Sequence, residues 1–229
     1  MTPETLATVL AARAAGRAVV LATRLANGAQ WVLPDDAAPA VVRAAAEVAL
    51  RRDLAGVMEL DSERWFLHPL APPPRLLIVG AVHIAQVLVP LAEAAGFAVS
   101  VIDPRGGFAT AARFPGVRLI QAWPDEALTA LAPDARTAVV TLTHDPKLDD
   151  PALDLALRGP AFFIGSLGSR KTQAARLERL AALGHAPVAL ARIRGPVGLA
   201  IGALTTPEIA VSILAEVIAC RRGAALARR

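Results

Sequence analysis

The feature that most constrains this chain is a regular alternation, after residue 74, of short apolar runs with stretches of helical character. Such alternation is typical of a parallel sheet covered on both faces, because each crossover between parallel strands needs a connection as long as a helix. The sequence therefore predicts an α/β fold with a Rossmann-like parallel sheet. We expect strands at residues 75–79, 98–103, 117–121, 137–141 and 161–165, and helices at 83–95, 124–131, 151–157, 169–183 and 207–221.

A proline-rich segment at residues 71–74 divides the chain into two expected domains. Consecutive prolines cannot continue a helix or donate to a β-ladder, so this segment is predicted to be a semi-rigid linker. Residues 1–70 are expected to form a small N-terminal α+β domain, with helices at 3–15 and 38–52. Its two hairpins are predicted around Asn27-Gly28 and around residues 61–63. Residues 75–229 are expected to form the Rossmann-like domain.

Composition excludes several classes of protein. More than half of the residues are apolar, yet no uninterrupted apolar run reaches the roughly 18 residues of a membrane helix, and no basic-then-apolar segment opens the chain. A cytoplasmic protein that does not enter membranes is expected. Its single cysteine, Cys220, allows no internal disulfide or thiolate zinc cluster, so no metal site is predicted. The net charge of +4 comes from scattered arginines without interleaved aromatics, which disfavours nucleic acid.

The turn after the first strand of the sheet is the first candidate ligand site. Gly80, Val82 and His83 lie where a strand gives way to a helix, and backbone N–H groups at such a position favour an anion. The dinucleotide pattern requires glycine two residues after Gly80, and Val82 stands there instead. Both a nucleotide-like ligand and a turn that binds no dinucleotide stay open.

The end of the second strand supplies a second candidate. Asp103 lies about twenty residues beyond Gly80, at the position from which a carboxylate accepts hydrogen bonds from ribose hydroxyls. Arg105 could add a contact to a phosphate or a pterin. The alternative is that Asp103 merely begins a turn before a proline.

The loop after the fourth strand carries His144 and Asp145 at the carboxyl edge of the sheet, where open α/β sheets bind their ligands. We expect a binding role for this pair and no catalytic one. Asp149 and Asp150 are expected to cap the helix that follows.

A second turn from strand to helix contains Gly165, Gly168, Ser169 and Arg170. Cations in a first helical turn oppose the helix dipole unless an anion lies nearby, so Arg170 predicts a second phosphate contact. The spacing is not that of a Walker A loop, which leaves ATPase chemistry without support.

Five segments, taken in order, closely resemble the Rossmann domain of the XdhC/CoxI family of xanthine dehydrogenase accessory factors. The resemblance covers about residues 75–223 and is carried by residues 78–85, 101–105, 143–153, 163–170 and 195–202. It implies a non-catalytic accessory protein that binds the molybdenum cofactor, molybdopterin, and helps its sulfuration together with a cysteine desulfurase. It also implies delivery of the cofactor to a molybdenum hydroxylase such as xanthine dehydrogenase.

Three positions depart from the family pattern. The family usually has glycine at Val82, aspartate at Ala200 and a cysteine in its N-terminal domain, whereas residues 1–74 contain none. A shortened carrier, a divergent member with another ligand and a partner subunit all stay open.

Two other classes of protein would fit the same fold. An NAD(P)-dependent oxidoreductase suits Asp103, although Val82 and the absence of tyrosine count against it, and a methyltransferase that binds S-adenosylmethionine is also compatible. The helix predicted at 207–221 is apolar around most of its surface, which suggests burial on two sides and a homodimer.

Overall fold

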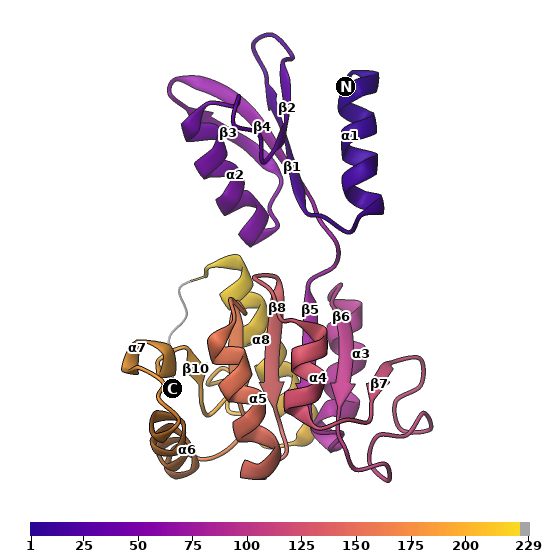
Figure 1. The fold of residues 1–229 in the computed structure, drawn as a ribbon, viewed down its shortest axis with the longest axis vertical. Helices are drawn as coiled ribbons and strands as arrows, with labels where there is room; N and C mark the ends of the chain where they lie inside the picture. The colour runs from indigo at the N-terminus through magenta and orange to yellow at the C-terminus, as the bar shows by residue number, and fades with distance from the viewer. Residues whose placement is uncertain (225–229) are drawn as a thin grey trace. The chain divides into compact units, whose positions relative to one another are not determined.

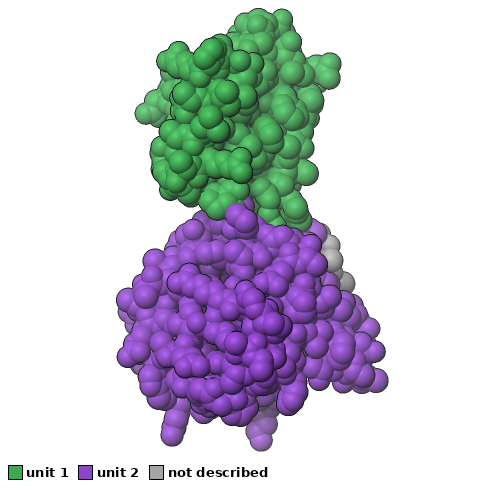
Figure 2. All heavy atoms as spheres, turned by 90° about the vertical axis from the view of Figure 1, so that its right-hand side faces the viewer, with its two compact units in different colours: residues 1–72, 221–223 green, residues 73–220, 224–229 purple. Residues whose placement is uncertain are grey.

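The structure, a computed structural model, describes residues 1–224, which form two compact units (Figure 2). The first comprises residues 1–72 with 221–223, and the second comprises residues 73–220 with 224. The division falls inside the segment 71–74. The last five residues of the expected Rossmann-like domain, 225–229, lie outside the described residues.

The second unit contains a parallel sheet. Within the described residues its six strands lie in the order β10-β9-β8-β5-β6-β7, and every neighbouring pair is parallel. Central strands are buried on both faces, which explains why they read as continuous apolar runs in the sequence. The predicted fold class is confirmed. The strands are β5 (Arg75–Val79), β6 (Ala98–Ile102), β7 (Arg118–Ile120), β8 (Thr137–Thr141), β9 (Phe163–Ser166) and β10 (Ile193–Arg194).

Helices cover both faces of this sheet (Figure 1). On one face α3 (His83–Ala94) and α8 (Thr206–Arg222) pack against side chains such as Ile78 and Val140. On the other face α4 (Pro124–Leu131), α5 (Pro146–Arg158) and α6 (Arg170–Ala182) pack against side chains such as Val79 and Val139. Alternate residues of each strand therefore serve opposite layers of the core.

The helix α8 is buried around most of its surface, as its apolar residues predict. Its inner face, which includes Ile213 and Val217, is completely buried, whereas Val211 and Ile218 on its outer face are 47% and 36% exposed. The strip at Val211 and Ile218 is thus the exposed part of the helix, and the expected homodimer stays a prediction.

The start of α5 corrects another expectation. The helix begins at Pro146 rather than at residue 151, and Pro151 lies inside it. Asp145 is the N-cap and accepts a hydrogen bond from the Lys147 amide at 2.9 Å. Asp149 and Asp150 are helical residues rather than caps. The prediction failed because proline was taken as a helix start at its second occurrence, although proline is equally favoured after the Asp145 cap. The short α7 (Pro187–Leu190) and β10 were not predicted.

The first unit is the α+β structure that the sequence predicts. Within it, strands β2-β1-β4-β3 form an antiparallel sheet, and Trp65 and Leu67 of β4 share a buried core with Val42 of α2. No described helix in either unit is both long and apolar enough to cross a membrane. The elements are α1 (Pro3–Ala14), β1 (Val19–Arg24), β2 (Gln30–Leu33), α2 (Ala40–Arg52), β3 (Gly56–Leu60) and β4 (Glu63–Leu70).

Candidate functional site

The turn between β5 and α3 lies at the switch point of the sheet, where the chain passes to β6 on one side and to β8 on the other. Open α/β sheets usually bind their ligand in the crevice at this point. Here the crevice is crowded by protein. Gly80 has φ +111°, and a Cβ placed on it would lie 2.7 Å from Thr143 Cγ2. The backbone at Gly80 is therefore pressed against the loop that follows β8.

Asp103 closes the same turn from the other side. Its completely buried carboxylate accepts hydrogen bonds from the Ala81 amide at 2.8 Å and from the Arg105 guanidinium at 2.9 and 2.8 Å. The Arg105 amide donates a further hydrogen bond to it at 3.0 Å. Burial alone would raise the pKa of Asp103, but these donors outweigh burial and hold the pKa below its usual value. The carboxylate is thus engaged with protein donors rather than presented to a ribose.

Arg113, which sequence reasoning missed, fastens the loop after β6 onto the start of α3. Its guanidinium donates to the carbonyl oxygens of Ala81 and Phe108 at 2.8 and 2.7 Å and to Gln86 Oε1 at 3.0 Å. The Arg105 guanidinium lies 4.3 Å from the centre of the Phe108 ring. Arg113 was missed because nothing in its local sequence shows that it bonds to a turn about thirty residues earlier.

The loop between β8 and α5 is organised by Thr143. Its hydroxyl donates to Asp149 Oδ1 at 2.7 Å and accepts from the Asp145 amide at 3.0 Å. His144, at φ +62°, adopts the left-handed conformation and is exposed, and Asp145 is occupied as the cap of α5. His83 is exposed at the start of α3. In the described residues neither His144 nor His83 makes a side-chain hydrogen bond, so neither forms a pair with a carboxylate.

A buried ion pair lies beneath this loop. Asp149 and Arg176 are almost completely buried, with Asp149 Oδ2 and Arg176 Nη2 3.9 Å apart. Burial raises the pKa of the Asp149 carboxyl despite its hydrogen bond to Thr143 and the charge of Arg176. Arg176 also donates to Gln173 Oε1 and to the Leu167 carbonyl, at 2.6 and 2.9 Å. The pair therefore connects the loop after β8 to the turn after β9.

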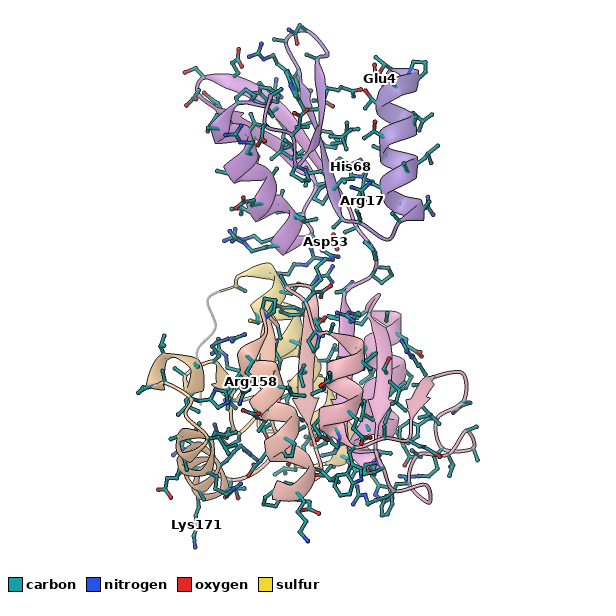
Figure 3. All side chains as sticks on the ribbon, in the orientation of Figure 1. Glu4, Arg17, Asp53, His68, Arg158 and Lys171 are labelled. Atoms are coloured by element: carbon teal, nitrogen blue, oxygen red, sulfur yellow. The ribbon has the colours of Figure 1, made fainter. Side chains whose placement is uncertain are left out.

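The turn between β9 and α6 opens into a pocket of about 510 Å³. Ser169 is the N-cap of α6, and its hydroxyl oxygen accepts a hydrogen bond from the Thr172 amide at 3.1 Å. Arg170 lines the pocket and has no ion pair or hydrogen-bonded side chain among the described residues. Lys171, one residue later, points away from the body of the unit (Figure 3). The lining residues are Gly168, Ser169, Arg170, Ile193, Arg194, Gly195, Pro196, Gly198, Leu199 and Glu216.

The far wall of this pocket comes from residues whose role the sequence did not reveal. The loop after β10 is pressed onto α8, because a Cβ on Gly198, at φ +107°, would lie 2.4 Å from Ser212 Oγ. The Gly198 amide donates to Glu216 Oε2 at 2.7 Å. The glycine punctuation of residues 195–202 was the available signal, but spacing alone could not connect it to Glu216.

The candidate residues thus lie in three places. Gly168, Ser169 and Arg170 share the pocket. Gly165 lies within β9, where a Cβ would lie 2.6 Å from both Phe163 and Val197 side chains. None of the remaining candidates lines that pocket, and they surround the crowded turn at the switch point: Gly80, Val82, His83, Asp103, Arg105, His144 and Asp145.

Neither a metal site nor a reactive thiol is evident among residues 1–224. No group of three histidine, cysteine, aspartate or glutamate side chains there could hold a metal ion. Cys220 is half-buried on α8, its thiol donates to the Phe162 carbonyl at 3.3 Å, and burial raises its pKa. A thiol in this state is a poor nucleophile at neutral pH.

The sheet order defines a Rossmann-type domain, and the pocket lies at the carboxyl edge of its strands, where such domains usually bind small ligands. The family model described as the XdhC Rossmann domain matches residues 76–217. The chain therefore belongs to the XdhC family, as its resemblance predicted.

Individual relatives agree with this assignment. The chain is 35% identical over 162 residues to a Bacillus subtilis protein named as a probable component of xanthine dehydrogenase, an alignment that covers 70% of the chain and 47% of the relative. It is 33% identical over 150 residues to the molybdenum cofactor insertion chaperone PaoD of Escherichia coli, covering 66% of the chain and 41% of PaoD. The chain thus spans less than half the length of these two relatives.

A solved structure shares the fold. A crystal structure described as a xanthine dehydrogenase from Bacillus halodurans superposes with a TM-score of 0.70 at 26% identity. The match covers 96% of this chain and 64% of that one. Both units of the chain therefore have counterparts in a known structure.

Proposed function

We propose that this protein binds the molybdenum cofactor and takes part in the maturation of a xanthine dehydrogenase-type molybdenum hydroxylase. Its membership of the XdhC family supports this role, as does its similarity to a protein named as a molybdenum cofactor insertion chaperone. The role is that of an accessory protein that holds and hands over a cofactor, without a catalytic residue of its own.

The observation that carries the proposal is the pocket at the start of α6. The pterin of the cofactor bears a phosphate, and the pocket offers the amide end of a helix together with the unpaired guanidinium of Arg170. Helix N-termini and arginines are favoured phosphate partners. A volume of about 510 Å³ lies in the range of small-ligand sites. These donors fit the phosphate end of the cofactor.

The turn at Gly80 is a poorer candidate for the same ligand. Asp103 accepts the Ala81 amide that would otherwise face an anion there, and Thr143 lies against Gly80. The same contacts argue against NAD(P), for which the switch point is the usual site. We therefore place the phosphate at Arg170 and assign Asp103 and Arg105 to the support of the loop after β6.

Sulfuration of the cofactor would depend on a second protein. Cys220 is the only cysteine of the chain, and it is half-buried with a raised pKa. We infer that a cysteine desulfurase supplies the sulfur while this chain holds the cofactor. A homodimer, proposed to form through the exposed outer face of α8 at Val211 and Ile218, completes the expected assembly.

The test is a binding titration with molybdenum cofactor released from a purified molybdenum hydroxylase. Wild type should bind it, Arg170→Ala should bind about tenfold more weakly, and Lys171→Ala should stay within about twofold of wild type. Lys171 is the matched control because it carries the same charge in the same helical turn but points away from the unit (Figure 3). NADH, NADPH and S-adenosylmethionine are titrated in parallel.

Two results would contradict the proposal. Equal affinity of wild type and Arg170→Ala for the cofactor would remove the pocket from its binding site. Tight binding of NADH with no binding of the cofactor would instead support an oxidoreductase.

A further inference from the structure

The pocket at the start of α6 has a carboxylate in its wall as well as cations. Glu216 of α8 lines the same pocket as Arg170. Its Oε2 accepts the Gly198 amide at 2.7 Å, which fixes the side chain, while its Oε1 has no partner among the described residues. A site for a phosphate alone gains nothing from a carboxylate, because like charges repel. The pocket therefore offers a hydrogen-bond acceptor as well as cationic donors.

Arg170 and Glu216 come from different elements, and Ser169, Arg194 and apolar residues line the pocket with them. Arg170 begins α6, whereas Glu216 lies in the middle of α8, and the lining also includes Ile193, Pro196 and Leu199. Such a pocket suits a ligand with three parts: an anion, a flat apolar ring, and N–H donors on the edge of the ring.

We propose that Glu216 recognises a 2-amino-4-oxo-pyrimidine ring, the edge that pterins and guanine share, while Arg170 holds the phosphate of the same ligand. This ring edge presents an exocyclic amino group beside a ring N–H, and one carboxylate can accept hydrogen bonds from both. The inference rests on the proposed binding of a phosphorylated pterin and adds to it the residue that reads the ring.

Other acidic side chains near this edge of the sheet are less suited to that task. Asp103 is buried and engaged with Arg105, Asp145 caps α5, and Asp149 is buried beside Arg176. Glu216 combines a fixed position with an available oxygen on the wall of the pocket. It is therefore the residue assigned to ring recognition.

The experiment compares GMP with IMP by calorimetry on the full chain. The two nucleotides share phosphate, ribose and ring system, and differ only in the exocyclic amino group that Glu216 would bind. Wild type should bind GMP about tenfold more tightly than IMP, since a hydrogen bond to a charged acceptor discriminates by at least this factor.

The test variant is Glu216→Gln, and Glu93→Gln is its control. Glutamine can still accept the Gly198 amide with its oxygen, but its NH₂ group then faces the donors of the ring. Glu216→Gln should therefore bind GMP and IMP with about equal affinity. Glu93 is exposed on α3 and outside the pocket, so Glu93→Gln removes the same charge and should keep the preference.

Three outcomes would overturn the proposal: equal binding of GMP and IMP by wild type, no detectable binding of either, or an unchanged preference in Glu216→Gln. Its failure is separable from that of the proposed function. Cofactor binding without discrimination between GMP and IMP would leave the proposed function standing and remove Glu216 as the reader. If wild type preferred GMP, Glu216→Gln lost that preference and the cofactor did not bind, Glu216 would remain the residue that reads the ring. The proposed function would then fail.

Discussion

Two turns of this protein share a local pattern, a buried strand followed by a glycine in the left-handed region and the start of a helix, yet their surroundings differ. At the first, Val82 is the N-cap without a side-chain hydrogen bond, and neighbouring loops fill the space in front of it. At the second, Ser169 caps α6 and the turn opens into a pocket. An anion site thus depends on what the adjacent loops leave uncovered, as well as on the turn itself.

The largest expected effect is the loss of stability on replacing Gly80, which would break the close packing of the first turn. Gly80→Ala combines φ +111° with a Cβ 2.7 Å from Thr143 Cγ2, and should cost about 3 kcal/mol of unfolding free energy. Gly168→Ala, at φ +146° with Thr172 Cβ at 3.2 Å, should cost less, about 1–2 kcal/mol. Urea unfolding measures both losses.

Gly106→Ala serves as the control for these two variants. A Cβ at Gly106 meets nothing within 4 Å, so the change should stay within about half a kcal/mol. If Gly80→Ala unfolded at the same urea concentration as wild type, the first turn could not be the crowded one.

The second effect is smaller and depends on pH. Asp103→Asn removes the carboxylate that holds the Ala81 amide and Arg105, and should cost about 1–2 kcal/mol at pH 7, a figure reduced because Arg105 is partly exposed. The pKa of Asp103 is lower in the folded protein than the ordinary 3.8, so its contribution is present above that value and is lost as the pH falls through the folded pKa.

The difference in unfolding free energy between wild type and Asp103→Asn should therefore be complete above about pH 4. It should shrink as the pH falls further. Thermal unfolding between about pH 2 and pH 7 measures this. A stability difference that stayed constant across the range would mean that the charge of Asp103 does not hold the turn.

Much of the fold could be predicted because each central strand lies between two helical layers and reads as an apolar run. Prediction failed where elements are too short for a period to develop, as in β10 (Ile193–Arg194). It also failed where two local signals competed, as at the two prolines of α5. Helix and strand periods carry no information about a two-residue edge strand.

The candidate site was harder to predict than the fold. The local signal at the second turn indicated Ser169 and Arg170, which line one pocket and whose binding role stays a prediction. Glu216, which lines the same pocket, lies in α8 with no motif around it. Asp103 has the spacing expected of a ribose-binding residue, and only the structure shows that its oxygens accept hydrogen bonds from Ala81 and Arg105. Spacing places a side chain on an edge of the sheet but does not show what it contacts.

The smallest expected effect tests whether the first turn is closed by Val82 alone. Val82→Gly completes the dinucleotide pattern. The affinity for NADH should nevertheless change by less than about 1 kcal/mol, or roughly fivefold. The reason is that Asp103 still accepts the Ala81 amide and still pairs with Arg105. Adding Arg105→Ala removes the two guanidinium donors to Asp103 and leaves the amides of Ala81 and residue 105, so any gain should be larger in the double variant. NADH fluorescence titration measures both. Tight binding by Val82→Gly alone would show that one side chain separates the two turns and that the surrounding loops do not.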